Sequence, residues 1–177
     1  FDERIKEWLI KTIKKEHHVD LSRDPAAMKR ITEAAEDAKK ALTSNFTTKI
    51  TLPYLAQVKG TPIHLDIDFT RAQFEELIRD LIDRTAEPVN NALQDAGIRA
   101  SQLGRVLLVG GSTRIPAVQQ KVRELTGKEP SKNINPDECV AKGAAILGST
   151  LEGNGLIAAG TGKDLLLLDV TPLSLSI

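Results

Sequence analysis

Two adjacent glycines, Gly110 and Gly111, stand between a short apolar run and a helix start predicted at Pro116. The run, Val-Leu-Leu-Val at residues 106–109, is typical of a strand buried on both faces. A strand that ends in glycines before a helix leaves backbone N–H groups free, and the helix dipole there favours a negative ligand. In open α/β sheets, ligands also collect at this end of the strands.

Two interpretations of this turn stay open on the spacing alone. The glycines either admit a ligand close to the backbone, or they only provide the positive φ of a tight strand-to-helix turn. The neighbours Ser112 and Arg114 favour the ligand, because both side chains are able to face one.

The second candidate is a row of polar residues on one predicted helix. A spacing of i, i+3, i+4 and i+7 puts them on one face, and they are Glu36, Lys39, Lys40 and Thr43. A carboxylate, two amines and a hydroxyl in a row can bind ribose hydroxyls and stack on or hydrogen-bond an adenine. The residues alone nevertheless favour an ordinary solvated helix face with an i,i+3 ion pair.

Other segments match known motifs only in part. Residues 155–163 do not fit a phosphate-binding P-loop, because its spacing would require Gly at Ile157 and Ser or Thr at Asp164. Residues 153–155 do not fit a dinucleotide-binding motif, because such a motif follows a strand and none is predicted there; its third glycine would also fall on Ala158. The histidines, His17, His18 and His64, do not have the spacing of metal ligands, so we expect no metal site.

Composition excludes several classes of protein. Lys and Arg total 24, as do Asp and Glu, so no bulk charge indicates a nucleic-acid partner. The most apolar run, residues 165–168, is too short to span a membrane. The single Cys139 excludes an internal disulfide framework and fits a reducing compartment. An abrupt start at Phe1 without Met leads us to expect a piece of a longer chain.

Periodicity indicates the elements that would position these residues. Helical spacing predicts a helix over residues 3–17, and Asp24 followed by Pro25 is a helix start. Alternation over residues 63–69 predicts a strand, which residues 50–52 are expected to pair with.

Further helices follow this hairpin. Thr70 and Gln73 form a predicted capping box, and the helix they open is expected to kink or restart at Pro88 and to end at Gly97. Two more helices are predicted, one from Pro116 to near Gly127 and one from Pro136 with Asn135 as its cap. The second contains small residues and is expected to pack closely on a neighbour. The class is mixed α and β.

Four blocks of sequence, taken in order, resemble the DnaK-type heat-shock chaperones of the seventy-kilodalton class. They are FDERI at 1–5, LLVGGSTRIP at 107–116, NPDECVAKGAAILG at 135–148 and DLLLLDVTPLSLSI at 164–177. The resemblance implies an α/β, actin-like ATPase fold with a ribonuclease H-like lobe. The chain would be one lobe only, lobe II, with an inserted α+β subdomain.

The resemblance also implies a division of the chain. Residues 1–78 would be the outer subdomain, 79–162 the inner subdomain, 163–169 the interdomain linker and 170–177 the start of the peptide-binding domain. The linker side chains would be Leu165, Leu166, Leu167, Leu168 and Asp169. From the residues alone, this run is either a segment that docks reversibly or an internal core strand.

By the same resemblance, ten residues would bind the adenosine part of ATP or ADP. Glu36 and Lys39 would hold the ribose, Thr43 the adenine edge, and Lys40 and Arg114 the adenine faces; Gly110, Gly111 and Ser112 would pass close to the sugar and α-phosphate, with Asp137 behind them and Ile115 completing the set. The family often has Arg or an aliphatic residue where Lys40 stands, so base affinity is expected to differ here.

The family's γ-phosphate loops, catalytic Lys and most Mg²⁺-binding carboxylates match nothing in this chain. Phosphoryl transfer depends on charge neutralisation around the γ-phosphate. The resemblance therefore implies that the chain has no catalytic residue, binds ATP or ADP weakly, leaves Mg²⁺ to the intact domain and hydrolyses ATP negligibly.

The function implied is that of a fragment of an ATP-dependent molecular chaperone, active in protein folding and the stress response. Its partners would be a nucleotide-exchange factor, a J-domain co-chaperone and client polypeptides bound through a peptide-binding domain that the chain lacks. The alternative is a non-catalytic interaction module that binds these co-chaperones or the linker of a neighbouring copy. The bacterial cytoplasm and the mitochondrial matrix both fit as locations.

Overall fold

The computed structural model describes residues 1–131 and 135–151, which fall into two compact units. The first unit comprises Phe1–Val106 and Ser112–Pro130, and the second comprises Leu107–Gly111 and Ser131–Ile177. Residues 152–177, which include the predicted linker at 163–169 and the tail at 170–177, lie outside the described residues.

The first unit begins with two helices, α1 (Asp2–His17) and α2 (Pro25–Ser44), as predicted. The carboxylate of Asp24 accepts hydrogen bonds from the N–H groups of Ala26 at 3.0 Å and Ala27 at 3.1 Å. Pro25 occupies the first turn, where its missing N–H costs nothing. The predicted cap therefore starts α2 and fixes the phase of the face that carries the candidate residues.

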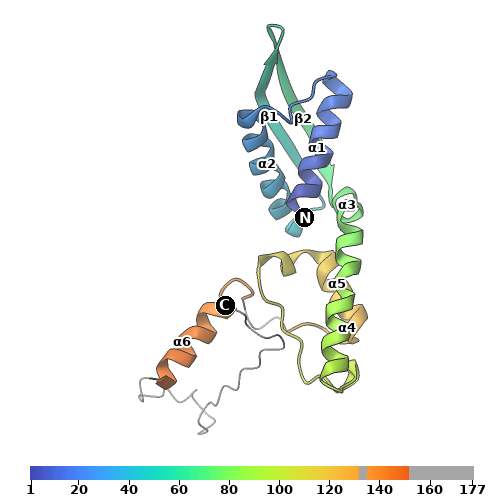
Figure 1. Ribbon diagram of the computed structural model, residues 1–177, viewed down its shortest axis with the longest axis vertical. Coiled ribbons are helices and arrows are strands. Elements are labelled where there is room, and N and C mark those ends of the chain that lie inside the picture. Colours follow the sequence, from blue (N-terminus) through green and yellow to red (C-terminus); the bar gives the residue numbers. More distant parts are fainter. Residues whose placement is uncertain (132–134, 152–177) are drawn as a thin grey trace, which may run out of the picture. The chain divides into compact units, whose positions relative to one another are not determined.

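An antiparallel hairpin of β1 (Thr47–Val58) and β2 (Thr61–Thr70) follows, and its pairing confirms the predicted strands. Ile50 lies opposite Ile67 and Leu52 opposite Leu65. Because side chains alternate between the two faces of a strand, one face of the hairpin is apolar and buried. Figure 1 shows α1 and α2 beside this hairpin.

One hydrophobic core joins the helices to the hairpin. Trp8 of α1 stacks on Phe69 of β2 with ring centroids 4.5 Å apart, and Phe69 meets Phe74 of α3 edge to face at 6.5 Å. The fully buried side chains include Ile5, Leu9, Ile13, Ile31, Leu42, Leu65 and Ile78. Leu, Ile and Ala thus build most of a core in a chain with few aromatic residues.

The predicted capping box is present, because Thr70 and Gln73 exchange hydrogen bonds at the start of α3 (Arg71–Arg84). Thr85 separates α3 from α4 (Ala86–Asp95), which carries Pro88 in its first turn, so the expected restart is confirmed. Gly97 follows with a φ of 64°. The remaining elements of this unit are η1 (Ala100–Gln102), η2 (Gly111–Arg114), which starts at the unit boundary, and α5 (Pro116–Thr126), closed by Gly127 at a φ of 66°.

The predicted buried strand at residues 106–109 is wrong for this structure. Leu107 and Val109 are 49% and 45% exposed, and the segment has no regular structure. A strand needs a partner for its backbone groups. Among the described residues the sheet consists of β1 and β2, which pair with each other.

In the second unit, α6 (Cys139–Leu151) begins three residues later than predicted. Residues 136–138 form a turn instead, in which the side-chain oxygen of Asn135 accepts a hydrogen bond from the N–H of Asp137 at 3.2 Å. Val140 and Ile146 of α6 are exposed, so the close packing expected of this helix is not formed by the described residues. None of the helices described is long and apolar enough to cross a membrane.

Candidate functional site

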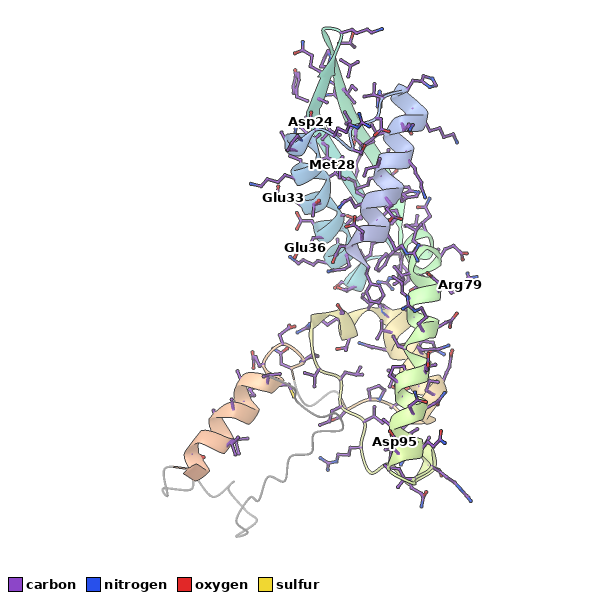
Figure 2. The ribbon with its side chains drawn as sticks, viewed as in Figure 1. Asp24, Met28, Glu33, Glu36, Arg79 and Asp95 are labelled. Atoms are coloured by element: carbon purple, nitrogen blue, oxygen red, sulfur yellow. The ribbon has the colours of Figure 1, made fainter. Side chains whose placement is uncertain are left out.

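Glu36 and Lys40 form an ion pair on the exposed side of α2. Their oxygen and nitrogen lie 2.7 Å apart, and Figure 2 shows Glu36 projecting away from the core. The hydrogen bond from Lys40 lowers the pKa of Glu36, and Glu36 raises the pKa of Lys40 in turn. The carboxylate is therefore ionised at neutral pH and is able to accept hydrogen bonds from hydroxyl groups.

Lys39 does not take part in that pair, although an i,i+3 pair with Glu36 was the simpler expectation. Its Nζ lies 2.7 Å from Oδ1 of Asp2, in the first turn of α1, and the Lys39 side chain is only 18% exposed. An ammonium group has three donors. Lys39 can therefore keep Asp2 as a partner and still offer a hydrogen to another acceptor.

Thr43 uses its hydroxyl hydrogen within the helix. Its Oγ1 donates to the carbonyl of Lys40 at 2.7 Å. The lone pairs of the oxygen remain, so the side chain is suited to accept a hydrogen bond from a ligand amine. Glu36, Lys40 and Thr43 thus form a contiguous polar row, with Lys39 turned toward α1.

Ile115 holds the start of α5 to the core of the first unit. It is 1% exposed, and its carbonyl accepts from Val118 and Gln119 in the first turn of the helix. Ser112 and Arg114, which precede it in η2, are exposed. The side chain of Ile115 therefore fixes the segment that presents these two polar residues.

The glycine turn lies in the second unit, and both glycines have a structural reason to be glycine. Gly110 has a φ of 88°, which side-chain-bearing residues rarely adopt. A Cβ on Gly111 would lie 3.2 Å from Oδ1 of Asp137. The turn is thus drawn tightly against the segment that begins α6.

The N–H of Gly110 is not free, contrary to the expectation for this turn. It donates to the carbonyl of Pro136 at 2.9 Å. The ten predicted residues are divided between the two units. Glu36, Lys39, Lys40, Thr43, Ser112, Arg114 and Ile115 belong to the first unit, and Gly110, Gly111 and Asp137 belong to the second.

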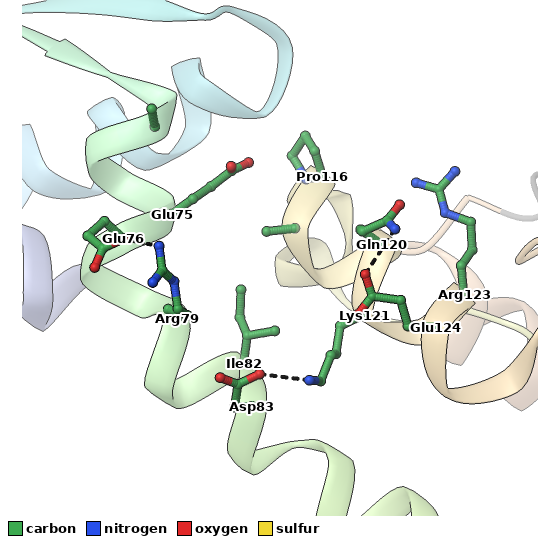
Figure 3. A pocket seen from close by; sticks show the side chains of 12 residues that line it. Glu75, Glu76, Arg79, Ile82, Asp83, Pro116, Gln120, Lys121, Arg123 and Glu124 are labelled. Carbon is green, nitrogen blue, oxygen red and sulfur yellow. Dashed lines mark hydrogen bonds and ion pairs between the residues drawn. The ribbon is translucent and has the colours of Figure 1, made fainter.

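Sequence reasoning missed a groove of about 690 Å³ between α3 and α5. Figure 3 shows Glu75 pointing from α3 toward α5 and an ion pair between Lys121 and Asp83 across the groove, 2.7 Å long. The hydrogen bond from Lys121 to Asp83 raises the pKa of Lys121. The lining residues follow the spacing of one face on each helix, as many solvated helix faces do. Contact between the helices makes them a groove, so no local pattern indicates it.

Among the described residues, no three His, Cys, Asp or Glu side chains gather as metal ligands would. The free Cys139 is half-buried at the start of α6. Carboxylates, amines and hydroxyls are present on α2, and the groove between α3 and α5 is lined by further charged side chains.

The elements described are mainly helices with a small two-stranded antiparallel sheet. A family model described as Hsp70 protein matches residues 1–177, the full length of the sequence. The chain belongs to the Hsp70 family. Membership implies ATP or ADP with Mg²⁺ as the ligands of the family and, in general, interactions with co-chaperones and clients.

Proposed function

We propose that the chain is lobe II of a DnaK-type ATPase domain and supplies the adenosine-binding half of a nucleotide site. The observation that carries the proposal is the exposed polar row on α2, Glu36 to Thr43, in a chain that matches the Hsp70 family throughout. The actin-like arrangement of the whole domain and its division at residues 78 and 162 are part of the same proposal.

The donor set on α2 fits a nucleoside. The ionised carboxylate of Glu36 and the ammonium of Lys39 suit the two hydroxyls of a ribose, which both donate and accept. The free lone pairs of Thr43 suit an amino group on the edge of adenine. Lys40 and Arg114 would lie against the faces of the base, a favourable place for a cation.

The glycine turn would meet the sugar and the α-phosphate. The position that a Cβ would take on Gly111 lies 3.2 Å from Asp137 Oδ1, so the glycine keeps the backbone close to this carboxylate, and a ligand would approach Gly111 from another side. Ser112 would add a hydroxyl, and Asp137 and Ile115 would hold the segment in place. Mg²⁺ would need carboxylates beyond these residues, so binding of ADP by this chain is proposed to be weak and largely independent of the metal.

The proposal is tested by adding millimolar ADP to the ¹⁵N-labelled chain and following the backbone amides in ¹H–¹⁵N spectra. We expect the amides of Thr43 and Gly111 to shift with ADP and to shift less with GDP, whose base lacks the adenine amino group. Glu36→Ala should weaken ADP binding about tenfold, the equivalent of one charged hydrogen bond.

The matched control is Glu33→Ala. Glu33 projects from an exposed side of the same helix (Figure 2). Its carboxylate oxygen lies 3.9 Å from the ammonium nitrogen of Lys29. We expect this variant to bind ADP as the unmodified chain does. The proposed site would be excluded if ADP shifted only amides outside the ten predicted residues. It would also be excluded if Glu36→Ala and Glu33→Ala weakened ADP binding equally.

A further inference from the structure

A bulge in β1 holds a tyrosine in a strained conformation at the surface. The register of the hairpin shifts between Leu52 and Ala56, and within this bulge Tyr54 has a φ of 48°. A bulky residue rarely adopts this left-handed region unless its surroundings hold it there. Tyr54 is 73% exposed, so burial of its ring does not account for the conformation.

Two side chains hold the backbone of the bulge. The N–H of Tyr54 donates to Nδ1 of His64 on β2 at 3.0 Å, and the two rings meet edge to face with centroids 4.5 Å apart. From α2, Arg30 donates through Nη1 to the carbonyl of Tyr54 at 2.8 Å and through Nη2 to that of Pro53 at 2.7 Å. His64 is thus the acceptor for an N–H that lies where the strand register is broken.

The hydrogen bond from Tyr54 requires an unprotonated Nδ1 on His64. A neutral imidazole has one donor and one acceptor nitrogen, whereas an imidazolium donates from both. Histidine is the side chain whose charge ordinarily changes between about pH 5 and 8. A proton on Nδ1 turns the acceptor into a second donor that faces the N–H of Tyr54, so the contact is lost.

The charged groups around His64 keep their charge over this range. Asp66, two residues along the same face of β2, pairs with Lys49 of β1 at 3.0 Å. Hydrogen bonds from Lys49 and Thr51 lower the pKa of Asp66, and Asp66 raises the pKa of Lys49. Arg30 is a cation at any pH that proteins tolerate. The contact between Tyr54 and His64 therefore depends on an unprotonated imidazole nitrogen, whereas the neighbouring ion pair of Asp66 and Lys49 does not.

We propose that Tyr54 and His64 form an acid-sensitive latch of the β1 bulge. Neutral His64 closes the latch and fixes the direction in which the Tyr54 ring projects. Protonation of His64 frees the N–H and the ring of Tyr54, while Arg30 keeps the bulge attached to α2.

The test follows the backbone amide of Tyr54 and the ring protons of His64 in the full chain from about pH 8 to about pH 5. We expect the Tyr54 amide to move with the same midpoint as the His64 ring, because it loses its acceptor at that point. The amide of Ile31, buried in α2, serves as the internal control and is expected to stay in place.

Three variants separate the latch from other effects. His64→Asn puts an amide oxygen near the position of Nδ1 and does not titrate, so the Tyr54 transition should disappear. His64→Phe keeps a ring but no acceptor, so the Tyr54 amide should have its acidic position already at about pH 8. His17→Asn with His18→Asn removes the other histidines and should leave the transition unchanged.

The proposal is overturned if the Tyr54 transition persists in His64→Asn, or if it is absent from the unmodified chain while His64 titrates. It is also overturned if the Ile31 amide moves together with Tyr54, since the event would then be acid unfolding of the whole unit.

Discussion

The ammonium nitrogen of Lys39 lies 2.7 Å from the carboxylate of Asp2, which ties the first turn of α1 to the penultimate turn of α2. Lys39 is also proposed to contact a ribose. One side chain would therefore hold two helices together and bind the ligand, so changes in the packing of α1 are expected to reach the candidate site.

Asp2→Asn is expected to lower the free energy of unfolding by about 1 kcal/mol, because it leaves a largely buried ammonium without its anion. Urea denaturation followed by circular dichroism measures the change. The matched control is Glu3→Gln, since Glu3 pairs with Lys6 at 2.6 Å but is mostly exposed. Its loss should be under about 0.5 kcal/mol. Equal losses would mean that the Asp2 pair has no special role.

Asp24→Ala is expected to cost about 1 kcal/mol, because two N–H groups at the start of α2 lose their acceptor. Asp24→Asn retains a capping oxygen and should cost less than half of that. Thermal unfolding of the three proteins at the same pH gives the order. If Asn and Ala were equally destabilising, charge rather than the cap would be responsible.

Acid is expected to destabilise the first unit partly through Asp20. Hydrogen bonds from Ser22 and Lys14, together with the charge of Lys14, hold the pKa of Asp20 far below its usual value. A carboxylate with a lowered pKa stabilises the fold above its unfolded value, about pH 3.9, and loses this contribution as the pH falls below it. Asp20→Asn should therefore flatten the decline of stability between about pH 5 and about pH 1, with the larger part of the effect below the unfolded pKa.

Denaturation curves of both proteins at several pH values within this window measure the effect of Asp20. The two proteins should converge in stability as the pH decreases. A constant difference across the whole window would show that Asp20 keeps the same protonation state in the folded and unfolded chains.

The purified chain is expected to release no phosphate from ATP above the buffer rate, because charge neutralisation around the γ-phosphate depends on groups that the chain is proposed to lack. A coupled phosphate assay with a complete Hsp70 protein as the positive control provides the measurement. ATP hydrolysis that copurifies with the chain and decreases in Glu36→Ala would refute the proposal that this chain lacks the groups needed for phosphoryl transfer.

Local signals predicted most of the first unit correctly. Asp24 with Pro25, and Thr70 with Gln73, mark helix starts through contacts within three residues, and both are present. The alternation of apolar and polar residues over 63–69 also predicted the buried face of β2, because successive side chains of a strand point to opposite faces.

The remaining features depend on partners far away in sequence. Residues 106–109 have the composition of a strand, but a strand forms only when another segment supplies its hydrogen bonds. Nothing in the spacing indicated that Lys39 would face Asp2, 37 residues away. The groove between α3 and α5 likewise arises from helix packing. Whether the ten predicted residues bind a nucleotide stays a prediction.

The stacking of Trp8 on Phe69 gives the protein an internal optical probe. Trp8 is the single tryptophan of the chain, and it joins α1 to the hairpin within the first unit. Its fluorescence therefore reports the unfolding of the first unit and does not report on the second unit, which contains no tryptophan. Comparing it with circular dichroism, which sees the helices of both units, would reveal whether the two units melt together or in sequence.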